Sequence, residues 1–113
     1  MLEIDRINEV VVVRLRDSDC LNARIAEAVK EELAELFSTP NVRMIFDLKG
    51  ITFIDSSGFG VFLSALKAAN KNYGQFKLCN VTGEVMEFFE LLQLHHVLEI
   101  YDQLDSCLSS FSP

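Results

Sequence analysis

Short apolar runs along the chain predict β-strands. Residues 10–13 are four consecutive valines, a β-branched run typical of a central strand. Residues 42–48 are mostly apolar, as in a strand that is covered on both faces. We expect further strands at residues 76–79 and 97–101, and residues 2–5 can pair antiparallel with the valine strand.

Between these strands, apolar residues recur at helical spacing. A first helix begins after Asn22, a candidate N-cap, and ends before Pro40. A second runs from about residue 56 to 72, and a third follows Thr82 as its cap. The expected inner face of the third helix is Val85, Phe88, Phe89 and Leu92. Apolar residues between 104 and 111 predict a last helix laid over the sheet.

Alternation of strands and helices indicates an α/β fold. Right-handed crossovers between successive strands give a mixed, mostly parallel sheet, here of four to five strands with about four helices packed against it. No repeat, linker or low-complexity stretch divides the chain. We therefore expect one domain over residues 1–113, which is long enough to bury a core without disulfides or metal.

The charge balance narrows the class of partner. Ten basic and 17 acidic residues give a formal net charge of −7. Nucleic acids and anionic membranes attract proteins with an excess of Lys and Arg, so neither is expected as the main partner. A protein with a basic surface fits this charge better, and a monomer is the simplest expectation for so small an acidic domain.

Cysteine and histidine spacing predicts no metal site. Cys20, Cys79 and Cys107 are far apart and odd in number, so we expect three plain thiols in a reducing compartment. His95 and His96 are adjacent and point in different directions, which favours a role at a helix end or turn. No signal sequence or membrane-length apolar run is present, so the expected location is the cytoplasm, with no cofactor.

The most informative segment is the turn Asp55-Ser56-Ser57-Gly58, which links an apolar stretch to an amphipathic helix. Its first three residues are all good N-cap types, so a well-capped helix start is a sufficient explanation. A helix N-terminus also accepts anions, because its first N–H groups lack partners within the helix. A phosphate on Ser56 adds about −1.5 to −2 charges and changes an exposed surface, and we do not expect it to unfold the domain.

With these residues assembled, the chain resembles the STAS domain family, and within it the bacterial anti-sigma factor antagonists. The resemblance is carried by Phe46-Asp47-Leu48 and by residues 53–60, with a partial match at residues 19–23. It extends over nearly the whole chain. The chain departs from the family at residues 16–18, Arg-Asp-Ser, where members commonly have a glycine, and at Phe59, which replaces an aliphatic residue.

The resemblance implies a partner switch without catalysis. In that family, the dephosphorylated antagonist binds an anti-sigma factor that is also a serine kinase, which frees a sigma factor; phosphorylation releases the antagonist, and a phosphatase resets it. By position, Ser56 is the phosphoacceptor and Ser57 is the neighbour that serves the helix cap. Asp55 and Gly58 shape the turn, and Asp19 lies on a neighbouring loop that faces the partner.

Three other functions are weighed against this one. A serine hydrolase needs a nucleophile elbow of the form G-x-S-x-G, which the chain lacks around Ser56. A nucleotide or small-ligand sensor would use the turn to hold a phosphate, but there is no phosphate-binding loop and no lysine beside the turn. The third alternative is a scaffold module of a signalling complex, which would have the same fold but no phosphorylation switch.

Overall fold

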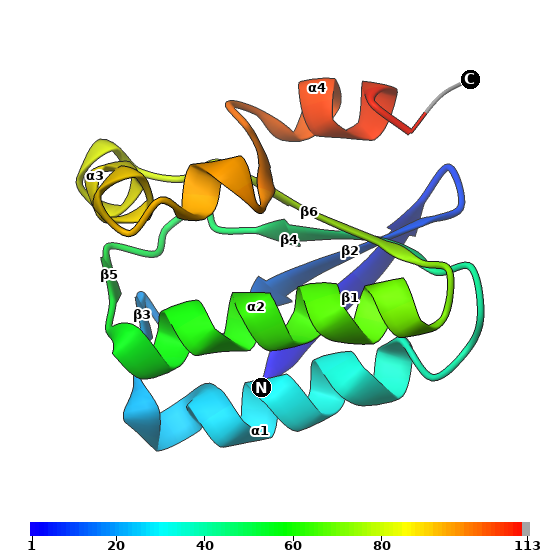
Figure 1. The fold of residues 1–113 in the computed structure, drawn as a ribbon, viewed down its shortest axis with the longest axis horizontal. Coiled ribbons are helices and arrows are strands. Elements are labelled where there is room, and N and C mark those ends of the chain that lie inside the picture. Colours follow the sequence, from blue (N-terminus) through cyan, green and yellow to red (C-terminus); the bar gives the residue numbers. More distant parts are fainter. Residues whose placement is uncertain (112–113) are drawn as a thin grey trace.

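The computed structural model describes residues 1–111, which build a five-stranded sheet (Figure 1). The strands are β1 (Leu2–Ile7), β2 (Val10–Leu15), β4 (Arg43–Asp47), β6 (Gln75–Cys79) and β7 (Glu99–Tyr101), and they lie in the order β1-β2-β4-β6-β7. β1 pairs antiparallel with β2, and every other neighbouring pair is parallel. The predicted mixed, mostly parallel sheet is confirmed. The sequence did not predict a second, two-stranded parallel sheet of β3 (Cys20–Leu21) and β5 (Phe53–Ile54).

Helices cover both faces of the main sheet. α1 (Ala23–Leu36) and α2 (Ser56–Lys71) lie side by side on one face, and α4 (Leu104–Ser109) lies on the other (Figure 1). α3 (Gly83–Leu91) and the 3₁₀ helix η1 (Leu94–His96) connect β6 to β7 at the end of the sheet where α2 begins. None of the helices in residues 1–111 is long and apolar enough to cross a membrane.

The two sheet faces bury two cores, because successive side chains of a strand point to opposite faces. In β2, Val11 and Val13 enter the larger core under α1 and α2, whereas Val10 and Val12 enter the smaller core under α4. β4 repeats the pattern, with Met44 and Phe46 in the larger core and Ile45 in the smaller one. The valine run is thus buried on both sides, as its composition predicts.

The prediction for the inner face of the third helix is half wrong. Val85 and Phe89 are buried, but Phe88 and Leu92 are about half exposed, at 52% and 51%. Phe89 fills the contact with α2, where its ring centroid lies 5.0 Å from that of Phe59. Because α3 lies at the end of the sheet, only one of its faces is covered.

Candidate functional site

The site centres on the start of α2, where Asp55 is the N-cap residue. Its Oδ1 accepts a hydrogen bond from the Gly58 N–H at 2.9 Å, and its Oδ2 accepts one from the Ala23 N–H at 3.0 Å. One carboxylate therefore holds the first turns of α2 and α1 together. Charge also favours this arrangement, since the N-terminus of each helix carries partial positive charge. Asn22 caps α1 as predicted, through a bond from the Arg24 N–H to its Oδ1.

Gly58 is required where α2 approaches β3. A Cβ atom at this position would lie 2.5 Å from the carbonyl oxygen of Leu21 and 2.6 Å from Cγ2 of Ile54. Any larger residue would push the helix away from the backbone of β3. The glycine therefore fixes how closely the turn that carries Ser56 sits on the domain.

Both serines of the turn are exposed, in keeping with a reactive surface. Ser56 is the first residue of α2. The prediction that Ser57 serves the cap is wrong, because Asp55 supplies the capping oxygen. Ser57 instead lines a shallow pocket of about 300 Å³ between α1 and α2, together with Glu27 and Lys30.

Asp19 lies on the same substructure as the turn, at the other end of the β3–β5 pair. Its carbonyl oxygen accepts a hydrogen bond from the Thr52 N–H at 2.8 Å, one residue before β5, and its side chain is exposed. Asp17, in the segment where family members commonly have glycine, adopts a left-handed conformation with φ of 53°. Aspartate tolerates this region better than most residues, so the left-handed position forms here without a glycine.

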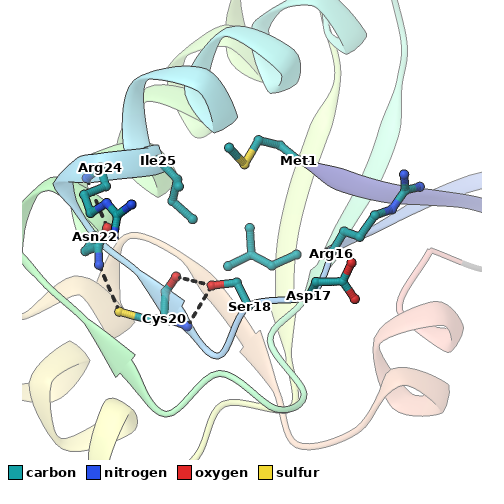
Figure 2. A pocket seen from close by; sticks show the side chains of 9 residues that line it. Met1, Arg16, Asp17, Ser18, Cys20, Asn22, Arg24 and Ile25 are labelled. Carbon is teal, nitrogen blue, oxygen red and sulfur yellow. Dashed lines mark hydrogen bonds between the residues drawn. The ribbon is translucent and has the colours of Figure 1, made fainter.

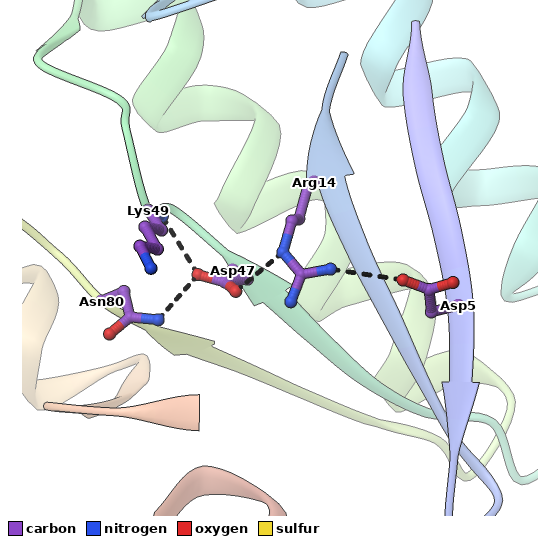
Figure 3. Close-up of polar contacts among 5 residues, drawn as sticks. All are labelled: Asp5, Arg14, Asp47, Lys49 and Asn80. Carbon is purple, nitrogen blue, oxygen red and sulfur yellow. Dashed lines mark hydrogen bonds and ion pairs between the residues drawn. The ribbon is translucent and has the colours of Figure 1, made fainter. Parts of the chain in front are cut away.

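Asp47 supports the loop that leads to the turn, a role that sequence reasoning missed. The carboxylate is buried at the end of β4 and accepts three hydrogen bonds of 2.9–3.0 Å, from Arg14 Nε, Asn80 Nδ2 and the Lys49 N–H (Figure 3). Arg14 also contacts Asp5 on β1 at 3.3 Å. The sequence signal for this role was a charged residue at the end of an apolar strand. Its buried charge is balanced by the arginine and the neutral donors.

A second hollow, of about 390 Å³, lies beside the loop of Asp19 at the start of α1. Figure 2 shows Met1 and Ile25 among the side chains that line it, with the guanidinium groups of Arg16 and Arg24 on opposite sides. A phosphate site brings its donors together on one point. Because these two cations stand apart, the hollow does not favour the nucleotide sensor.

Two of the cysteines and both histidines considered from the sequence lie in the core and in the 3₁₀ helix η1. Cys79 and Cys107 are buried in the core under α4. Two effects chiefly raise the pKa of the Cys79 thiol: the larger is its hydrogen bond with the Cys107 thiol, and the second is its burial. His95 and His96 lie in η1 with ring centroids 3.9 Å apart. Within residues 1–111, no group of three or more His, Cys, Asp or Glu side chains is placed to hold a metal ion.

Comparison with known proteins supports the resemblance seen in the sequence. Residues 1–107 match the sequence model of the STAS domain family. The chain belongs to the STAS family. The anti-sigma F factor antagonist of Paenibacillus polymyxa is 28% identical over 107 residues, covering 89% of this chain and 86% of that protein. The anti-sigma-B factor antagonist of Listeria monocytogenes is 26% identical over 102 residues, covering 83% and 90%.

Solved structures agree on the STAS fold. A STAS domain protein of Planctomyces limnophilus, described as an anti-sigma-factor antagonist, superposes with a TM-score of 0.90 at 17% identity, over 99% of this chain and 98% of that one. The unphosphorylated anti-sigma factor antagonist SpoIIAA superposes with a TM-score of 0.71 at 18% identity, over 97% and 96%. At these identities the likeness establishes the architecture alone.

Proposed function

We propose that the chain is an anti-sigma factor antagonist that binds an anti-sigma factor with serine kinase activity, and that phosphorylation of Ser56 releases it. The observation that carries the proposal is the position of Ser56, exposed at the first residue of α2 beside the Asp55 cap. Its relatives in Paenibacillus and Listeria are named antagonists of anti-sigma factors. SpoIIAA has been solved in an unphosphorylated and in a phosphorylated form.

The switch works through surface charge. The Ser56 hydroxyl oxygen attacks the γ-phosphorus of ATP and forms the new Oγ–P bond. The bond between the γ-phosphorus and the oxygen that bridges it to the β-phosphate breaks, so ADP leaves, and the hydroxyl proton is released. The new phosphate carries about −1.5 to −2 charges. The N-terminus of α2 attracts these charges and the Asp55 carboxylate repels them, so the fold is kept while the surface that the partner touches is altered. The partner kinase supplies ATP and Mg²⁺, a phosphatase restores the serine, and the antagonist catalyses no step itself.

The contacts around the serine suit this role. Gly58 and Asp55 hold the turn rigidly through a close backbone approach and two hydrogen bonds. Because the turn already has this conformation in the free chain, binding of the partner loses no free energy in ordering it. We place Asp19, Asp55, Ser56 and Ser57 on the partner-facing surface. Gly58, which was also expected there, is buried and acts by setting the position of the turn.

The test is incubation of the full chain with the cognate kinase and ATP, followed by mass mapping of the phosphorylated residue. We expect phosphate on Ser56, loss of the signal in Ser56→Ala, and retention in Ser57→Ala. Binding to the kinase should stay strong for Ser56→Ala and become weak for Ser56→Asp. Phosphate found only outside residues 56 and 57, or none, contradicts the proposal.

A further inference from the structure

The negative charge of the chain is concentrated in its last third. All ten Lys and Arg residues lie within residues 1–77, where eleven acidic residues nearly balance them. Residues 78–113 hold the other six acidic residues and no Lys or Arg. These six are all exposed: Glu84, Glu87, Glu90, Glu99, Asp102 and Asp105. The part of the molecule built by α3, η1, β7 and α4 is therefore a region of one sign of charge.

An exposed apolar patch lies inside this acidic region. We call it the α3 patch; it consists of Phe88, Leu91, Leu92 and Val97, which are 52%, 74%, 51% and 54% exposed. Leu91 and Leu92 follow Phe88 by three and four residues, so these three side chains share one outer face at the end of the helix. Single exposed apolar residues are ordinary, but four within ten residues of the chain are a concentration that is typical of interaction sites.

The helix that carries most of the α3 patch packs against α2 near its start. Phe89, beside Phe88 in the chain, packs against Phe59 with ring centroids 5.0 Å apart, and Phe59 lies one helical turn after Ser56. Figure 1 shows α3, the β3–β5 pair and the start of α2 at the same end of the molecule. A partner of ordinary interface size, which covers about 800 Å² of each protein, reaches both surfaces.

We infer that the α3 patch is a second contact surface for the anti-sigma factor, which meets it with an apolar surface rimmed by Lys or Arg. The inference rests on the proposed function, because it assigns this patch to the partner that Ser56 controls. Charge complementarity identifies the occupant: six acidic side chains and no basic one favour a basic protein surface. The same charges repel a second copy of the chain, a nucleic acid and an anionic membrane.

A hollow beside the patch offers a place for one basic side chain of the partner. It measures about 340 Å³ and is lined by residues 95–101, which include Val97 of the patch. Glu99 supplies a carboxylate there that is 61% exposed, and its Oε2 lies 3.7 Å from Nζ of the buried Lys77. The Nδ1 atom of His95, also in the lining, is buried and has no hydrogen-bond partner among residues 1–111. A lysine or arginine of the partner that entered the hollow would share this exposed carboxylate with Lys77.

The test compares matched variants of the full chain by calorimetric titration with the purified cognate anti-sigma factor. Leu91→Ser removes the most exposed side chain of the patch, and we expect the Kd to rise by about tenfold or more, as for a central interface residue. Tyr73→Ser is the control: Tyr73 is 84% exposed and follows the far end of α2, so its Kd should stay at the wild-type value. Circular dichroism checks that each variant is folded.

A second pair of variants tests the charge. Glu90→Lys places a cation beside the patch and should raise the Kd several-fold. The Kd of this variant should also depend less steeply on salt concentration than that of wild type. Glu35→Lys makes the same change in net charge near the end of α1 and should leave the Kd within about twofold of wild type. Equal effects of the two substitutions would mean that net charge alone matters, and would overturn the assignment of the acidic rim to the partner.

The outcomes separate this inference from the switch. If Leu91→Ser binds as wild type while Ser56→Asp binds weakly, the α3 patch is overturned and the switch stands. If Leu91→Ser weakens binding while Ser56→Asp does not, the patch stands and the switch is overturned. If the free chain sediments as a dimer that Leu91→Ser converts to a monomer, a second copy occupies the patch and the inference is wrong.

Discussion

Replacing Gly58 with alanine tests whether close packing, and not helix propensity, sets the residue at the start of α2. The added Cβ would meet the Leu21 carbonyl oxygen at 2.5 Å and Ile54 Cγ2 at 2.6 Å, whereas ordinary contacts begin at 3.4 Å. The helix start must therefore move by about 1 Å, and forcing an atom into a packed site costs about 1–3 kcal/mol. Alanine also gains about 1 kcal/mol over glycine inside a helix. Because the main obstacle is backbone, which cannot turn aside, we expect the clash to outweigh this gain and the net loss to reach up to about 2 kcal/mol.

Gly60 provides the matched control two residues along the same helix. A Cβ there has nothing within 4 Å, so Gly60→Ala should raise the free energy of unfolding by about 1 kcal/mol. Urea unfolding followed by circular dichroism measures both variants, and the midpoints should move in opposite directions. If Gly58→Ala proves as stable as Gly60→Ala, the close approach of α2 to β3 is not what selects glycine, and the reasoning fails.

Three further predictions follow from polar and thiol groups. Asp55→Ala removes two backbone hydrogen bonds and should lower the free energy of unfolding by about 1–2 kcal/mol, whereas Asp55→Asn, which keeps an acceptor oxygen, should recover part of the loss; equal effects of both would refute the capping role. Asp47→Ala should cost about 3 kcal/mol in urea unfolding, since three donors lose their acceptor, and a loss below 1 kcal/mol would contradict this. A bulky thiol reagent should modify only the half-buried Cys20 in the native protein and all three cysteines in urea; rapid reaction of Cys79 or Cys107 in native protein would show that their core opens.

Local patterns predicted most of the fold. The valine run gave β2 its central position, because a strand buried on both faces needs apolar residues in succession. Asn22 marked the start of α1 because its side chain supplies the acceptor that the first turn lacks. The two-stranded sheet of β3 and β5 escaped prediction because each strand has only two residues, and its pairing joins segments more than thirty residues apart.

The site was predicted less completely, for a related reason. In α3, residues 85, 88, 89 and 92 all fit a helical face. Contacts with Phe59 and Phe62 of α2 decide that Phe89 is buried, whereas Phe88 stays about half exposed. Asp47 is bonded to Arg14 and Asn80, each 33 residues away in the chain. Local spacing carries no information about such partners, so the buried network became visible only in three dimensions.

The shared cap at Asp55 gives the domain two built-in reporters of the state of Ser56. The amide hydrogens of Ala23 and Gly58 are both bonded to this one carboxylate, so each exchanges with solvent deuterium only when that bond opens. If Ser56 is phosphorylated as proposed, the phosphate repels this carboxylate and competes for the same amides. Under the proposed switch, the exchange rates of the Ala23 and Gly58 amide hydrogens, which are more than thirty residues apart in the chain, would both report the same modification of Ser56.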